Sequence, residues 1–153
     1  MLSRLKIRDL SGWTMAVFGV LAFLLGLLGI LFPEVILSLL GFQVIPRAER
    51  APGDYTLVFV IASAMASFNI GAYYVLAALN DMKPFYLWTV PFRMVTFAVF
   101  SLVVLSGIAP VAFLGVGVWE LVGALATGGA LYYERRRAEL APGPAQNRSN
   151  PAN

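Results

Sequence analysis

The chain has 153 residues, of which 59% are hydrophobic and only 12% are charged. Soluble domains carry about a quarter charged residues, so this composition indicates a single integral membrane domain. The absence of cysteine and histidine excludes disulfides, thiol chemistry and the usual ligands of haem and zinc, and we expect no cofactor and no metal site. The net charge of +3 comes mostly from basic clusters near the two ends, which favours a role in membrane orientation over nucleic-acid binding.

The chain starts with a basic segment, residues 1–12, and continues with an uncharged apolar stretch at 13–32. About 20 apolar residues are enough to cross a bilayer. A basic start is also typical of signal peptides, but this apolar run is longer than their hydrophobic region. It is followed by FPEV rather than by a small-residue cleavage site. We interpret 13–32 as a retained transmembrane helix.

Residues 33–42 carry the signals of a short helix. Pro33 suits a first helical position, Glu34 suits the positive end of a helix, and Gly41 suits its C-terminal stop. Two interpretations remain: a separate helix lying in the outer membrane interface, or a continuation of the first span that bends at Pro33. Residues 43–54 are expected to form an outer loop.

Three further apolar stretches follow, at 55–80, 84–106 and 108–133. Within the four stretches the only charged residues are Arg93 and Glu120. This pattern predicts an all-α integral membrane four-helix bundle in a domain 13–137, with the helices alternating up and down. Residues 138–153 are polar and proline-rich, and we expect a disordered cytoplasmic tail.

Lysine and arginine predict the orientation of the bundle. Arg47 and Arg50 fall on one side and are diluted by Glu49 and Asp54. The larger basic set falls on the other side and comprises Arg4, Lys6, Arg8, Lys83, Arg135, Arg136 and Arg137. Because positive loops stay inside, both termini are expected in the cytoplasm, for a multi-pass protein of the cell (inner) membrane.

The two intramembrane charges are predicted to lie at one depth. Arg93 precedes the turn at Gly107 by fourteen residues, and Glu120 follows that turn by thirteen. At 1.5 Å per residue both side chains are roughly 20 Å from the turn. Counting in the same way from the turn between 55–80 and 84–106, near Asp81 and Met82, places Asn69 at the same level. A charged residue inside a membrane is a functional hypothesis by default, although a fixed structural ion pair explains the pattern as well.

Helical spacing adds aromatic and hydroxyl side chains to this level, and Pro91 predicts a kink just before Arg93. The complete candidate layer, whether it binds a ligand or is structural, comprises Arg93, Glu120, Asn69, Tyr73, Tyr86, Thr96 and Trp119.

The motifs resemble those of a known family. The segment LFPEVILSLLGF, the arginine in the third span, the turn SGIAP and the stretch GVWELVGALATGGALYY together resemble the DoxX-like and BphX-like small four-helix membrane proteins. The resemblance implies a four-helix bundle in which Arg93 and Glu120 occupy the charged positions of that family. Some members are linked to quinone-related settings, and most are of unknown function.

Three functional hypotheses follow from these residues. The first is a binding or accessory protein whose polar layer holds a lipid or quinone-like molecule, with the bilayer as its other partner. The alternative is a small transporter or proton-coupled carrier that uses Glu120, which Arg93 would tend to keep ionised. An enzyme ranks last, because no histidine, cysteine or second intramembrane acid completes a catalytic constellation. Glycine-rich faces leave an oligomer open.

Overall fold

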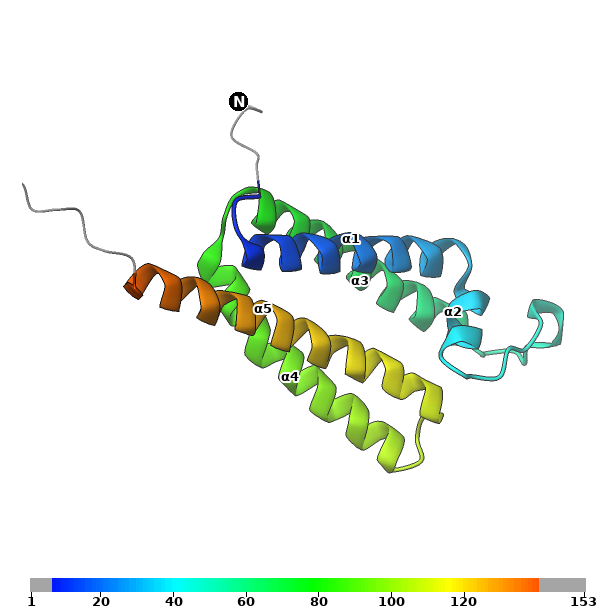
Figure 1. Ribbon diagram of the computed structural model, residues 1–153. Helices are drawn as coiled ribbons and strands as arrows, with labels where there is room; N and C mark the ends of the chain where they lie inside the picture. Colours follow the sequence, from blue (N-terminus) through cyan, green and yellow to red (C-terminus); the bar gives the residue numbers. More distant parts are fainter. Residues whose placement is uncertain (1–6, 141–153) are drawn as a thin grey trace, which may run out of the picture.

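A computed structural model describes residues 7–140 of the chain, and within this range it is helical with no strand (Figure 1). The predicted all-α class is therefore confirmed. Four of the helical segments are long and apolar enough to cross a membrane. The elements are α1 (Leu10–Leu31), α2 (Pro33–Leu39), the 3-10 turn η2 (Arg47–Glu49), α3 (Thr56–Leu79), α4 (Lys83–Leu105), the 3-10 turn η3 (Val111–Phe113) and α5 (Leu114–Leu140).

The ends of α1 and α2 follow from their sequence. Asp9 caps α1, because its Oδ1 accepts a hydrogen bond of 2.8 Å from the Gly12 amide. Phe32 leaves the helical conformation before Pro33, which begins α2 as a separate helix. A continuous bent first span is thus not what forms. Gly41, at φ +79°, adopts the left-handed conformation that ends the segment.

The last helix differs at both ends from the predicted stretch 108–133. After a turn at Gly107, which has φ +75°, Pro110 directs the chain into η3, so that α5 begins only at Leu114. At the other end α5 continues to Leu140, and residues 138–140 are helical rather than part of the tail. An ion pair of 3.1 Å between Arg135 and Glu139, one helical turn apart, supports this extension. The rest of the predicted tail and residues 1–6, with Arg4 and Lys6, lie outside the described residues.

Helices α1 and α3 pack backbone against backbone in an antiparallel pair. Gly19 lies against Gly71, and Gly26 lies against Ala64 and Phe68. A Cβ atom at Gly26 would lie 2.7 Å from Phe68 Cα and 2.8 Å from Ala64 O. Small residues that allow such an approach are typical of helix contacts in membranes.

Helices α4 and α5 form a second antiparallel pair, and α1 joins the two pairs through α5. The core lies at the end where α1 begins, around Met15, Ala77 and Tyr86. Toward the opposite end α4 diverges from α1 and α3 (Figure 1), and α3 and α4 meet through side chains, such as the rings of Tyr74 and Phe85 at 5.8 Å, rather than through close backbones. The helices are therefore two tight pairs that open on one side, rather than an evenly packed bundle.

The close contact between α1 and α3 predicts that the same substitution, glycine to alanine, has different effects on stability at two positions. Gly26→Ala is expected to lower the free energy of unfolding by about 1–3 kcal/mol, because its methyl group meets backbone atoms that cannot move aside. Gly129→Ala, on an open face of α5, should be neutral or stabilising through helix propensity. Thermal unfolding in a mild detergent measures both. Equal effects at the two positions would contradict the backbone contact.

Candidate functional site

The guanidinium group of Arg93 lies inside the protein between four helices. Arg93, on α4, is only 3% exposed. Its Cζ atom lies 4.8 Å from the ring centre of Phe18 on α1 and 4.9 Å from that of Tyr74 on α3. A Cβ atom at Gly123 of α5 would lie 2.8 Å from Cζ and would overlap Nη1. Two aromatic rings and a glycine thus create the space for this cation, and the rings stabilise it through cation–π attraction.

Glu120 is the nearest anion to Arg93 within the described residues. The distance between Arg93 Nε and Glu120 Oε2 is 3.8 Å, which is an ion-pair distance but too long for a hydrogen bond. The Glu120 side chain is 24% exposed. Both Nε and Nη1 of Arg93 are buried without a hydrogen-bond partner in the described part of the chain. Buried donors of a charged group are normally satisfied, so these two mark an incomplete site.

A cavity of about 690 Å³ adjoins these unpartnered donors. Its walls come from α3 and α4, which diverge at this level, and its floor comes from α1 and α5. Arg93 and Glu120 supply its charged groups. The remaining lining is mostly aromatic and aliphatic, with the hydroxyl groups of Ser63, Ser67 and Thr96 among the polar atoms. An apolar cavity of this size with a few convergent polar groups is typical of a small-molecule site.

The structure brings together five of the seven residues in the predicted layer. Arg93, Glu120, Tyr73, Thr96 and Trp119 line the cavity. Thr96 donates a hydrogen bond of 3.0 Å to the Phe92 carbonyl. The Trp119 ring packs edge-on against Phe18, with 4.6 Å between the ring centres. An aromatic wall therefore continues from Arg93 toward Trp119.

Two predicted residues lie elsewhere. Asn69 is half-buried on α3, does not line the cavity, and forms no hydrogen bond to Arg93 or Glu120 in the described structure. Tyr86 is fully buried in the core, where its hydroxyl donates a bond of 3.0 Å to the Ala77 carbonyl. Depth in the membrane is the argument for Asn69, and depth does not determine which way a side chain points. Helical spacing is the argument for Tyr86, but seven residues separate it from Arg93 by about 10 Å along α4. Pro91, where the sequence predicts a kink, lies inside helix α4, which runs from Lys83 to Leu105 without a break.

Sequence reasoning missed the groups that surround the guanidinium. Phe18 and Tyr74 come from helices far away in the chain, and a single sequence gives no signal for their meeting at Arg93. Gly123 has a weak signal, because it follows Glu120 by three residues and so shares its helical face. Within residues 7–140 no group of three or more acidic side chains is placed to hold a metal ion.

A second polar cluster, also missed, joins the start of α1 to α4 and α5. The Lys83 ammonium binds the Asp9 carboxylate, the Ser11 hydroxyl at 2.7 Å and Glu134 Oε2 at 2.7 Å. Glu134 also accepts a bond of 2.7 Å from the Ser11 amide. The sequence had suggested only an orientation signal for Lys83. Its cluster ties three helices together at the closed end of the molecule, opposite the divergence that opens the cavity.

Comparison of the chain with models of known protein families, with curated protein sequences and with solved structures gives no significant match.

The geometry of the ion pair predicts unequal effects of its two partners. Glu120→Gln should lower the free energy of unfolding by about 1–3 kcal/mol, because it leaves a buried cation that cannot lose its proton. Arg93→Met should change stability by less than about 1 kcal/mol, because it removes two unsatisfied donors and leaves a partly exposed carboxylate. The double variant should resemble Arg93→Met. Thermal unfolding in a mild detergent compares them, and a more damaging Arg93→Met would contradict this geometry.

The surroundings of Asp9 predict that the folded protein becomes less stable in acid. Partial burial raises the pKa of Asp9, but hydrogen bonds from Lys83 and from the Gly12 amide outweigh it and hold the pKa below its usual value. A carboxylate with a lowered pKa stabilises the fold above its unfolded pKa of about 3.9, and that contribution disappears as the pH falls through the folded pKa.

The melting temperature should therefore be steady near neutral pH and fall below about pH 4, and Asp9→Asn should flatten this fall. Asp81→Asn is the control, since Asp81 lies 3.7 Å from Lys83 on the outside of the same cluster. If Asp81→Asn removes the acid phase and Asp9→Asn does not, Asp9 is not the responsible group.

Proposed function

We propose that this protein is a multi-pass membrane protein that binds a lipophilic molecule, such as a lipid or a quinone-like compound, at Arg93 and Glu120. The observation that carries the proposal is the pair of buried Arg93 donors, Nε and Nη1, beside an apolar cavity. A bound oxygen atom from a ligand would satisfy them. The ligand would reach the site between α3 and α4, where the helices diverge.

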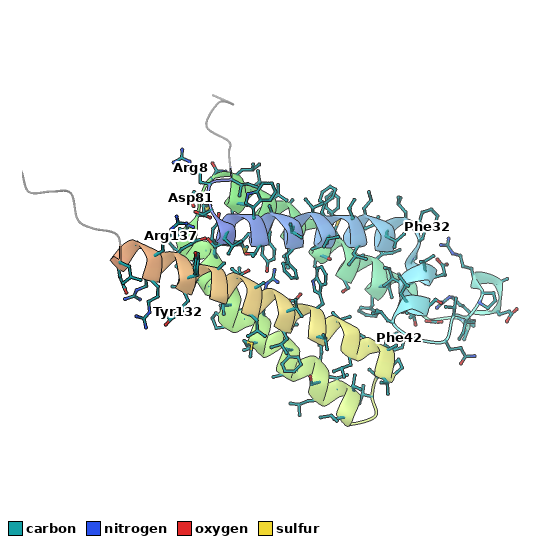
Figure 2. The ribbon with its side chains drawn as sticks, in the orientation of Figure 1. Arg8, Phe32, Phe42, Asp81, Tyr132 and Arg137 are labelled. Atoms are coloured by element: carbon teal, nitrogen blue, oxygen red, sulfur yellow. The ribbon has the colours of Figure 1, made fainter. Side chains whose placement is uncertain are left out.

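We propose that the protein lies in the cell (inner) membrane, with its long helices alternating in direction and both termini in the cytoplasm. Arg8, Asp81 and Arg137 lie at one end of the long helices, and Phe32 and Phe42 lie at the other (Figure 2). The basic residues Lys83, Arg135 and Arg136 belong to the first end. At the opposite end Arg47 and Arg50 are neutralised by ion pairs with Glu34 and Asp54, of 2.6 and 2.9 Å. This asymmetry supports a cytoplasmic location of the first end.

The resemblance to DoxX-like and BphX-like proteins belongs to the same proposal. It is supported by the arrangement that the resemblance implies, an arginine and an acid that face each other from α4 and α5. The α2 segment, with Pro33 at its start and Gly41 at its end, agrees with the same pattern.

The proposal is tested by the molecule that accompanies the purified protein. Lipids extracted from the wild-type protein in a mild detergent should contain one species enriched over the membrane extract. Arg93→Met should lose that species by at least about tenfold, since the donors that hold it are gone. Arg135→Met is the matched control, because the Arg135 side chain is 82% exposed on the surface of α5.

An unenriched lipid profile, or equal enrichment in both arginine variants, would contradict binding at Arg93.

The carrier hypothesis gives a different result, a proton flux into vesicles that depends on Glu120. In support of that hypothesis, the Glu120 carboxylate is partly exposed in the cavity wall. Reconstituted wild-type protein and Glu120→Gln distinguish the two functions.

A further inference from the structure

A second apolar cavity lies next to the one at Arg93. It has a volume of about 640 Å³ and is formed by α2, the first half of α3, and η3 with the start of α5. Among its lining residues are Leu37 and Leu39 of α2, Phe59 and Val60 of α3, and Phe113 of η3. No charged side chain of the described residues lines it. Its chemistry suits hydrocarbon.

The two cavities are adjacent. They share the lining residues Leu25, Ser63, Ser67 and Val116. The hydroxyl of Ser67 at this junction donates a bond of 3.0 Å to the Ala22 carbonyl, so it presents no unsatisfied polar group to a passing chain. Along α3 the lining runs from Thr56 to Tyr74, which is about 27 Å of helix. A ligand that fills both cavities is long and narrow, with its polar end at Arg93.

The charges at Arg93 indicate the kind of head group. Two donors of Arg93 lack an acceptor, and the Glu120 carboxylate at 3.8 Å accepts no hydrogen bond within the described residues. The two charges balance each other. An anionic head group would bring a second negative charge beside Glu120, which is unfavourable in a medium of low dielectric constant. An uncharged head group with one acceptor and one donor satisfies both side chains.

We propose that the ligand is a single-chain amphiphile. Its uncharged head group offers a carbonyl oxygen to Arg93 and a hydroxyl to Glu120, and its long hydrocarbon chain occupies the second cavity. One chain fits, because a cavity of this volume is the size of one small-molecule site. This inference rests on the proposed function and adds the ligand class and the place of its chain.

The test uses monoacylglycerols as probes. Dissociation constants for monooleoylglycerol, monooctanoylglycerol and oleate are measured by native mass spectrometry at a pH where oleate is ionised. Monooleoylglycerol should bind at least about tenfold more tightly than either of the other two. Val60→Phe, which fills the second cavity, should remove most of the advantage of the long chain and leave the affinity for monooctanoylglycerol unchanged.

Val58→Phe is the matched control, because Val58 is 60% exposed on α3 and lines neither cavity. Arg93→Met should weaken both monoacylglycerols by the same factor, since it acts on the head group. Equal melting temperatures of the two phenylalanine variants exclude misfolding as the cause.

Three results would overturn the inference. They are a preference for oleate, an equal affinity for long and short chains, or a long-chain preference that persists in Val60→Phe. If the natural lipid is still lost in Arg93→Met, the proposed function stands and only the chain and head-group assignment fails. If Arg93→Met retains that lipid, the proposed function fails whatever the probes show.

Discussion

The backbone contact between α1 and α3 determines where the protein can be open. Gly19, Gly26 and Gly71 bring the backbones of these two helices into direct contact. Helix α4 packs on α5 instead, and α1 connects the two pairs through α5. The part of α3 that carries Ser67 and Tyr74 meets α4 only through side chains, such as the Tyr74 ring against Phe85 and Arg93, and otherwise borders the cavity. The cavity follows from this unequal pairing, and lipid-facing helices tolerate it because the bilayer covers their outer sides.

Arg93 makes the opening costly unless something occupies it. The rings of Phe18 and Tyr74 each attract the cation, by about 2 kcal/mol or more where water is excluded. Each unsatisfied donor of a buried charged group costs about 1–3 kcal/mol. These terms are of similar size, so the cation–π attraction only offsets the cost of the unsatisfied donors. The cluster of Lys83, Asp9 and Glu134 holds three helices together at the closed end and lets the other end remain open.

The sequence predicted what depends on composition and local order. The helical class follows from long apolar stretches, the start of α2 follows from Pro33, and the turn before η3 follows from Gly107. Depth counting placed Arg93 and Glu120 at one level, and they are an ion pair. Asn69 shows the limit of that argument, because depth says nothing of rotation about the helix axis. Phe18 and Tyr74 were beyond prediction, since their meeting at Arg93 depends on the packing of three helices.

Bilayer hydrocarbon alone would not complete the site. Lipid chains can fill the apolar lining near Leu37 and Val60, but they carry no acceptor for Nε and Nη1 of Arg93. Water could bond to both Arg93 and Glu120, but it would not cover the apolar surface of Phe18 and Trp119 beside them. A molecule that joins an oxygen-bearing head to a hydrocarbon chain meets both requirements at once. The adjacency of an unsatisfied cation and an apolar cavity is therefore the argument for the proposed amphiphile over water or lipid hydrocarbon alone.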